Sequence, residues 1–126
     1  MQDIDFTHIP VNLCPRPGKV EPIPSEYKAP LQYFGWVAQR ERSFASLIVN
    51  LYKPQIVGAD MYNMMPYFSR ETCVTLNDGM LILLSYSAYF ESHELYGLPF
   101  VEALIKQYGF EEKRSWFNRF KSKAKK

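Results

Sequence analysis

Proline is spread very unevenly along this chain of 126 residues. Proline lacks an amide donor and disfavours helix at the preceding residue. Residues 1–29 are therefore predicted to form an extended arm. Apolar side chains such as Phe6, Ile9 and Ile23 occur throughout it, which indicates that the arm lies along the body of the protein. The alternative is a free Pro-rich arm that captures a partner. Six of the nine prolines fall in the first 30 residues: Pro10, Pro15, Pro17, Pro22, Pro24 and Pro30.

Residues 30–109 are predicted to form a helical core. Apolar positions from Leu31 to Tyr52 recur at spacings of three, four and seven, which is typical of one face of a helix. This helix is predicted to begin near Ser25 or Pro30 and to end before residue 54. Glu41 interrupts the face, and it marks either a break in the helix or a buried ion pair.

Three more helices follow from local signals. A short helix is predicted over residues 60–65 and is ended by Pro66. Another is bounded by Pro99 at its start and Gly109 at its end. The last runs from residue 110 to about residue 122, with acidic residues in its first turn and basic residues in its later turns.

The segment around Asn77-Asp78-Gly79 has two interpretations. It can cap a helix that runs from residue 79 to about residue 95, with Gly97 as the stop. It can also be the turn of a hairpin over residues 72–86. The long run rich in Leu and Met, followed by glycine, favours the helix. Because that helix would be apolar nearly all round, it is predicted to lie at the centre of the fold.

These patterns predict one mainly α domain spanning residues 1–126. It is a compact bundle of four to five helices, made of an arm at 1–29, a core at 30–109 and a basic amphipathic helix at 110–126. The alternative is an α+β fold with a hairpin at 72–86. A chain of this length can bury a core of its own, and 47% apolar against 22% charged residues is typical of a globular protein.

Basic residues are concentrated at the end of the sequence. The other 112 residues hold eight basic and all 13 acidic residues, a net charge of −5. A basic tail on an acidic body favours contact with an anionic partner, or with the chain's own acidic surface. The candidate anion and phosphate contacts are the seven basic residues of segment 113–126: Lys113, Arg114, Arg119, Lys121, Lys123, Lys125 and Lys126.

Two aromatic clusters are the candidate partner-binding surfaces in a chain whose residues are 16% aromatic. At about 100° per residue, the rings of the last helix share one face. Methionine adapts to irregular binding surfaces, but it also fills gaps in cores, and the role in the core is the favoured one for the cluster in the middle of the chain. The candidates are Met61, Tyr62, Met64, Met65, Tyr67 and Phe68 in the middle of the chain, and Trp116, Phe117 and Phe120 in the tail.

No motif indicates catalysis, a metal or a cofactor. Glu91, His93 and Glu94 are the best enzyme candidates, but an exposed polar end of the central helix is the favoured explanation of these residues. The cysteines and histidines lack ligand spacing, so no metal or cofactor is expected. The start of the chain does not resemble a signal peptide, and the longest apolar run, residues 80–84, is far shorter than the roughly 20 residues of a membrane span. A cytoplasmic location is expected.

The sequence therefore predicts a non-enzymatic binding or adaptor protein that acts through protein–protein contact. A small subunit of a larger assembly and an inhibitor from a mobile element both fit this description. The first alternative is a nucleic-acid-binding protein that uses the basic tail. The second is a small enzyme centred on Glu91, His93 and Glu94. A membrane surface ranks below protein and nucleic acid as a partner, because a short Lys-rich end is a weak anchor.

Overall fold

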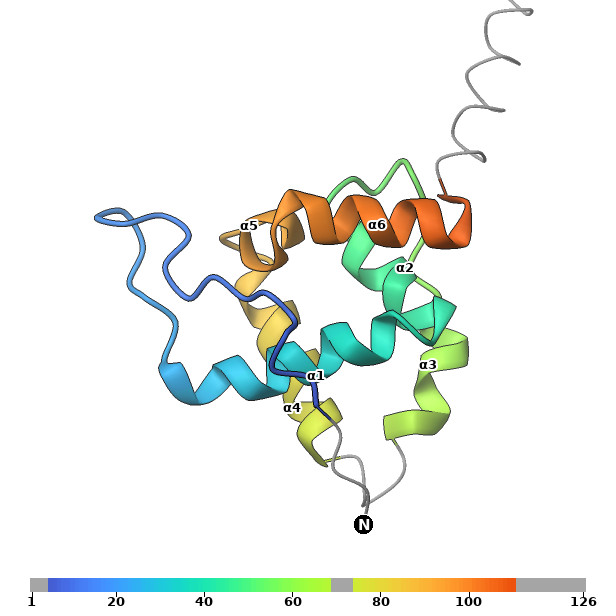
Figure 1. Ribbon diagram of the computed structural model, residues 1–126, viewed down its shortest axis with the longest axis horizontal. Coiled ribbons are helices and arrows are strands. Elements are labelled where there is room, and N and C mark those ends of the chain that lie inside the picture. Colours follow the sequence, from blue (N-terminus) through green and yellow to red (C-terminus); the bar gives the residue numbers. More distant parts are fainter. Residues whose placement is uncertain (1–4, 69–73, 111–126) are drawn as a thin grey trace, which may run out of the picture.

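A computed structural model describes residues 5–68 and 74–110 (Figure 1). Within these ranges the chain forms helices and no strands, so the predicted mainly α fold is confirmed. The hairpin alternative at 72–86 is wrong, because α4 covers residues 74–86. The helices of the described ranges are one 3-10 turn, η1 (Ser25–Tyr27), and six α-helices: α1 (Lys28–Ala38), α2 (Arg42–Asn50), α3 (Met61–Phe68), α4 (Val74–Tyr86), α5 (Ser92–Tyr96) and α6 (Leu98–Tyr108).

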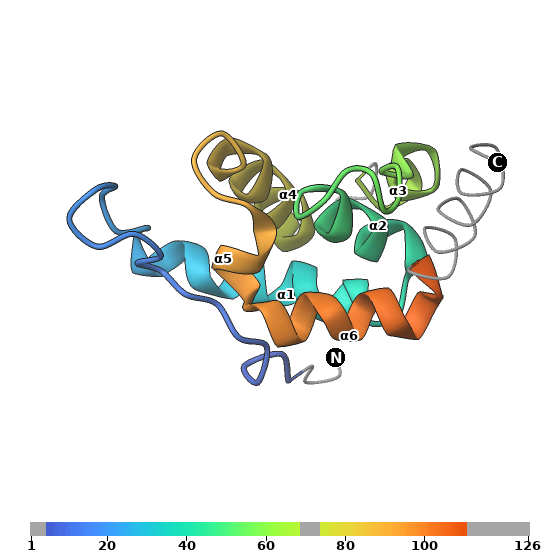
Figure 2. The same cartoon turned by 90° about the horizontal axis from the view of Figure 1, so that it is seen from above.

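Helix α1 is the centre of the arrangement. It packs against α4 and α2, and α2 in turn contacts α6 and α3. Seen from above, α4, α2 and α3 lie on one side of the molecule and α6 on the other (Figure 2). All six helices bury side chains in one continuous core, whose largest fully buried members include Phe34, Phe44, Ile48, Met64, Leu76, Leu83, Tyr96 and Leu104.

The first predicted helix is two helices in the structure. Glu41 has an extended backbone, with φ −124° and ψ 115°, so the chain turns between α1 and α2. Its carbonyl oxygen accepts hydrogen bonds from the amides of Phe44 and Ala45 at 3.1 and 3.2 Å. The interruption predicted at Glu41 is therefore a break, and this break is one reason why residues 5–68 and 74–110 contain six α-helices, more than the four to five predicted.

Helix α4 differs from the predicted helix at both ends. It begins five residues before Gly79 and ends at Tyr86, not near residue 95. Gly79 is inside the helix and marks the crossing with α1. A Cβ atom at this position would lie 2.5 Å from the carbonyl oxygen of Pro30 and 3.2 Å from the Cβ of Phe34. The glycine that resembles a turn signal is required for close packing of two helices.

Two prolines were predicted to mark helix ends, and only one of them does so in the structure. Pro66 lies inside α3 and does not end it, so the predicted boundary at 60–65 is wrong. Pro99 is in the first turn of α6, and Gly109 ends that helix with φ +73°, as the sequence predicts. The last predicted helix, from residue 110 to about residue 122, lies almost wholly outside the described residues.

The described part of the N-terminal arm, residues 5–24, contains no helix and contacts the body at several points. Ile9 and Ile23 are buried in the core. The amide of Asn12 donates to the carbonyl of Leu95 at 2.7 Å, and the side chain of Gln32 donates to the carbonyl of Ile9 at 3.0 Å. These contacts fix the arm across α1 and α5, so that its second half runs back towards η1.

Candidate functional site

The three residues of the enzyme hypothesis have structural contacts. Glu91 is the N-cap of α5 and forms a reciprocal capping box with Glu94. Glu94 also accepts two hydrogen bonds from the guanidinium of Arg16, both 2.9 Å long, which lower the pKa of its carboxyl. The Nδ1 atom of His93 lies 3.5 Å from Glu91, and its ring meets the ring of Tyr52 edge-on. Capping of α5 and docking of the arm account for Glu91 and Glu94.

The Met- and Tyr-rich segment 61–68 is divided between core and surface. Met64 is 0% exposed and belongs to the core, so it cannot contact a partner in this structure. Tyr67 and Phe68 are half-buried, and their rings pack against Phe44. Of the six candidates in this segment, those that remain on the surface of α3 are Met61, Tyr62 and Met65, and Tyr62 is the most exposed of them at 83%.

The tail candidates lie outside the described residues: Trp116, Phe117 and Phe120 with the cations Lys113, Arg114, Arg119, Lys121, Lys123, Lys125 and Lys126. The last described residue before them is Phe110, at the end of α6. Its ring is buried, stacks on Tyr108 and lies 4.8 Å below the guanidinium of Arg42. The residue that precedes the tail in the sequence is therefore firmly packed.

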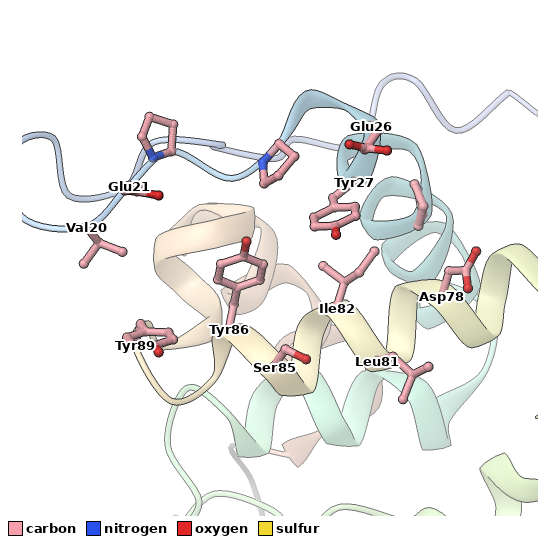
Figure 3. A pocket seen from close by; sticks show the side chains of 13 residues that line it. Val20, Glu21, Glu26, Tyr27, Asp78, Leu81, Ile82, Ser85, Tyr86 and Tyr89 are labelled. Carbon is pink, nitrogen blue, oxygen red and sulfur yellow. The ribbon is translucent and has the colours of Figure 1, made fainter.

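One hollow on the described surface was not predicted from the sequence. It is a groove of about 910 Å³ between residues 20–30 and α4 (Figure 3). One wall consists of the end of the arm and η1, and the other is the outer side of α4 with the turn that follows it. We call it the arm–α4 groove. Its lining residues are Val20, Glu21, Pro22, Pro24, Glu26, Tyr27, Pro30, Asp78, Leu81, Ile82, Ser85, Tyr86 and Tyr89.

The α4 wall follows from helical periodicity. Asp78, Leu81 and Ser85 are spaced by three and four residues, so they share one side of the helix. Leu81 is 64% exposed, and Tyr89, in the turn after the helix, is 59% exposed. Tyr86 is half-buried, and burial, with smaller contributions from Tyr27 and Glu21, raises the pKa of its hydroxyl. This phenol is neutral at physiological pH and can donate a hydrogen bond into the groove.

The arm wall is held by backbone contacts. The amide of Ile23 donates to the carbonyl of Leu13 at 2.7 Å, while the Ile23 side chain is inserted into the core. The amide of Tyr27 donates to the carbonyl of Pro24 at 3.0 Å and begins η1. Pro22 and Pro24 flank Ile23 and present rigid rings to the groove. The wall is therefore preformed.

The groove carries one sign of charge. Glu21, Glu26 and Asp78 are its charged lining residues, and no lysine or arginine of the described part of the chain lines it. Both glutamates and the aspartate are exposed, and none of them forms an ion pair with a described residue. Apolar rings and aliphatic side chains between three carboxylates are suited to a cationic, partly apolar occupant.

A second hollow of about 510 Å³ lies between the arm and α5. His8, Gln32, His93 and Glu94 are among its lining residues. Within residues 5–68 and 74–110, no group of three or more His, Cys, Asp or Glu side chains could hold a metal ion. None of the described helices is long and apolar enough to cross a membrane.

The chain matches no family model, no curated protein and no solved structure. The sequence contains a periodic signal for one wall of the arm–α4 groove, the wall formed by α4. Asp78, Ser85 and the flanking apolar residues of α4 recur at helical spacing, and this spacing would have separated an outer from an inner side once the helix was placed correctly. The opposite wall is about 55 residues away in the sequence, and no local pattern reveals it.

Proposed function

We propose that this chain is a non-enzymatic binding protein that acts through protein–protein contact at the arm–α4 groove. The observation that supports this proposal best is the exposure of Leu81 and Tyr89 beside preformed proline rings. Exposed apolar side chains that are gathered in one place and rimmed by polar groups mark interaction sites. Tyrosine is enriched in such sites because it combines an apolar ring with a polar tip.

The charge of the groove favours protein over nucleic acid as its occupant. Glu21, Glu26 and Asp78 would repel phosphate groups, whose neutralisation by cations dominates nucleic-acid affinity. A nucleic-acid contact through the basic tail is a separate hypothesis. It predicts binding to an oligonucleotide that weakens steeply as salt concentration rises.

The proposal is tested by affinity capture from native lysate with three forms of the full chain. The groove variant is Leu81→Ser with Tyr89→Ser. The control is Leu98→Ser, which changes an apolar residue of 39% exposure on α6, outside the groove. We expect at least one protein to be enriched by the wild type and the control and lost with the groove variant, while all three melt at nearly the same temperature.

The proposal is overturned if every protein captured by the wild type is captured equally by the groove variant. A groove variant that melts at a much lower temperature would show that Leu81 and Tyr89 support the fold instead. Substitution of Ser85, which is exposed and lines the groove, by a photo-crosslinking amino acid then gives a second measurement with a smaller change.

A further inference from the structure

We propose that the occupant of the arm–α4 groove is the basic tail, residues 113–126, of a second copy of this chain. This inference rests on the proposed function, because it names the partner of the same groove. It joins two features that lie far apart in the sequence: a described groove with three carboxylates and a segment with seven cations and no acidic residue.

Charge is the first argument. The described residues hold nine acidic and seven basic side chains, so the body beside the groove has no excess of cations to neutralise Glu21, Glu26 and Asp78. The tail supplies the opposite charge at high density. Complementary charges of this kind accelerate association and select the partner, even where each exposed pair contributes little affinity.

The apolar character of both surfaces is the second argument. In the tail, Trp116, Phe117 and Phe120 alternate with Arg119 and Lys121. In the groove, the aliphatic and aromatic side chains lie between the carboxylates (Figure 3). The close-up shows the Tyr27, Ile82 and Tyr86 side chains extending from the two walls towards the space between them. Tyrosine faces also attract lysine and arginine side chains through cation–π contacts.

The path of the chain favours a second copy over the same molecule. The tail begins after Phe110, which is packed at the end of α6 by Tyr108 and Arg42. Figures 1 and 2 both place the end of α6 on the opposite side of the molecule from residues 20–25 and the end of α4. A tail that entered the groove of its own body would have to cross the molecule first. To enter the groove of a neighbouring copy, the tail does not have to cross its own molecule.

The inference is tested by titrating a fluorescently labelled peptide with the sequence of residues 110–126 against the full-length protein at low salt. The groove variant is Glu21→Gln, Glu26→Gln and Asp78→Asn. The matched control is Asp5→Asn, Glu41→Gln and Glu102→Gln, which removes the same charge at residues that do not line the groove. We expect the groove variant to bind about tenfold more weakly than the wild type, and the control to bind like the wild type.

A peptide with Trp116→Ala and Phe120→Ala tests the apolar part, and we expect it to bind more weakly than the natural sequence at every salt concentration. Equal loss of peptide binding in the groove variant and the control would overturn the inference, because general electrostatic attraction would then explain the binding. No binding of the natural peptide to the wild type would also overturn it.

Sedimentation of the full-length protein over a range of concentrations tests whether the tail in the groove belongs to a second copy of the chain. We expect self-association at low salt that is lost in the groove variant and retained in the control. A protein that remains monomeric while the peptide binds its groove would overturn the second copy as the occupant. If the peptide fails to bind but lysate proteins still depend on Leu81 and Tyr89, the proposed function stands and only this inference fails.

Discussion

Both sides of α4 carry leucine side chains, but the two sides have different structural roles. On the inner side, Leu76 and Leu83 are almost completely buried, and Gly79 lets the backbone of α1 approach closely. On the outer side, Leu81 is exposed and lines the arm–α4 groove with Asp78. The comparison shows that the presence of an apolar side chain such as leucine does not by itself distinguish a core face from a binding face. The neighbouring element makes the difference: a packed helix on one side and an open proline wall on the other.

The largest effect is expected where the inner side is tightest. Gly79→Val would place a branched side chain against the Pro30 carbonyl oxygen, which lies only 2.5 Å from the position of a Cβ atom. Overpacking against rigid backbone should lower the free energy of unfolding by about 3 kcal/mol. Chemical denaturation measures this value. Gly58→Val is the matched control, because nothing lies within 4 Å of a Cβ there. A control as unstable as the Gly79 variant would contradict the explanation.

A smaller loss is expected at Tyr96, which packs beneath α1. Its buried hydroxyl donates to the carbonyl of Leu31 at 2.7 Å. Tyr96→Phe keeps the ring and leaves that carbonyl without this donor, which should cost about 1 to 2 kcal/mol. Tyr62→Phe, on the exposed surface of α3, removes a hydroxyl from a ring that is 83% exposed and should change the unfolding free energy little. Urea titration of both variants separates the buried from the exposed hydroxyl.

The next effect on stability depends on pH. It concerns the ion pair between Arg16 and Glu94, which holds the N-terminal arm in place. The Arg16 guanidinium lowers the pKa of Glu94 below its ordinary value of 4.5. A carboxyl with a lowered pKa stabilises the fold above its unfolded pKa, and this contribution disappears as pH falls through the folded pKa. Because the side-chain amide oxygen introduced by Glu94→Gln could still accept from the Glu91 amide, this substitution isolates the ion pair.

At pH 7 we expect Glu94→Gln to be less stable than the wild type by about 0.5 to 1 kcal/mol, since Arg16 is partly exposed. The difference should shrink below pH 4.5 and vanish in stronger acid. Denaturation at several pH values measures it, with Glu102→Gln as the exposed control. A difference that stays constant across this range would rule out the ion pair as its source.

The smallest effect on stability is expected at the outer side itself. Leu81→Ala should change the unfolding free energy by less than about 0.5 kcal/mol, because the side chain is 64% exposed. Leu83→Ala, two residues away and 1% exposed, should cost about 3 kcal/mol. Parallel melting curves test this pair. Similar losses for both leucines would mean that the outer side is part of the core and not a binding surface.

Sequence patterns predicted α6 well because its signals are local. Pro99 and Gly109 have fixed conformational preferences, and these preferences act at the ends of the helix itself. Gly79 misled the prediction because the reason for its presence is not local. The carbonyl oxygen of Pro30, about 50 positions earlier in the sequence, leaves no room for a side chain at position 79. Such a contact leaves no periodic trace in a single sequence.

The candidate surfaces were predictable only in part. The surface of α3 includes Met61, Tyr62 and Met65, while Met64 is turned into the core, as a helical period of 3.6 requires once the register is known. The arm–α4 groove could not be predicted, because its walls come from segments about 55 residues apart in the sequence. Burial of Ile23 sets the position of one wall, and the crossing at Gly79 sets the other.

The docking of the arm has a consequence for the order in which the protein matures during synthesis. Arg16 pairs with Glu94, 78 positions later, and Asn12 bonds to the carbonyl of Leu95. The proline wall therefore lacks these anchors until α5 has left the ribosome. Contacts of such long range form late, after local helices. A nascent chain from which α4 but not α5 has emerged has the outer side of α4 but no completed groove, so recognition at this site is reserved for a chain in which α5 has folded.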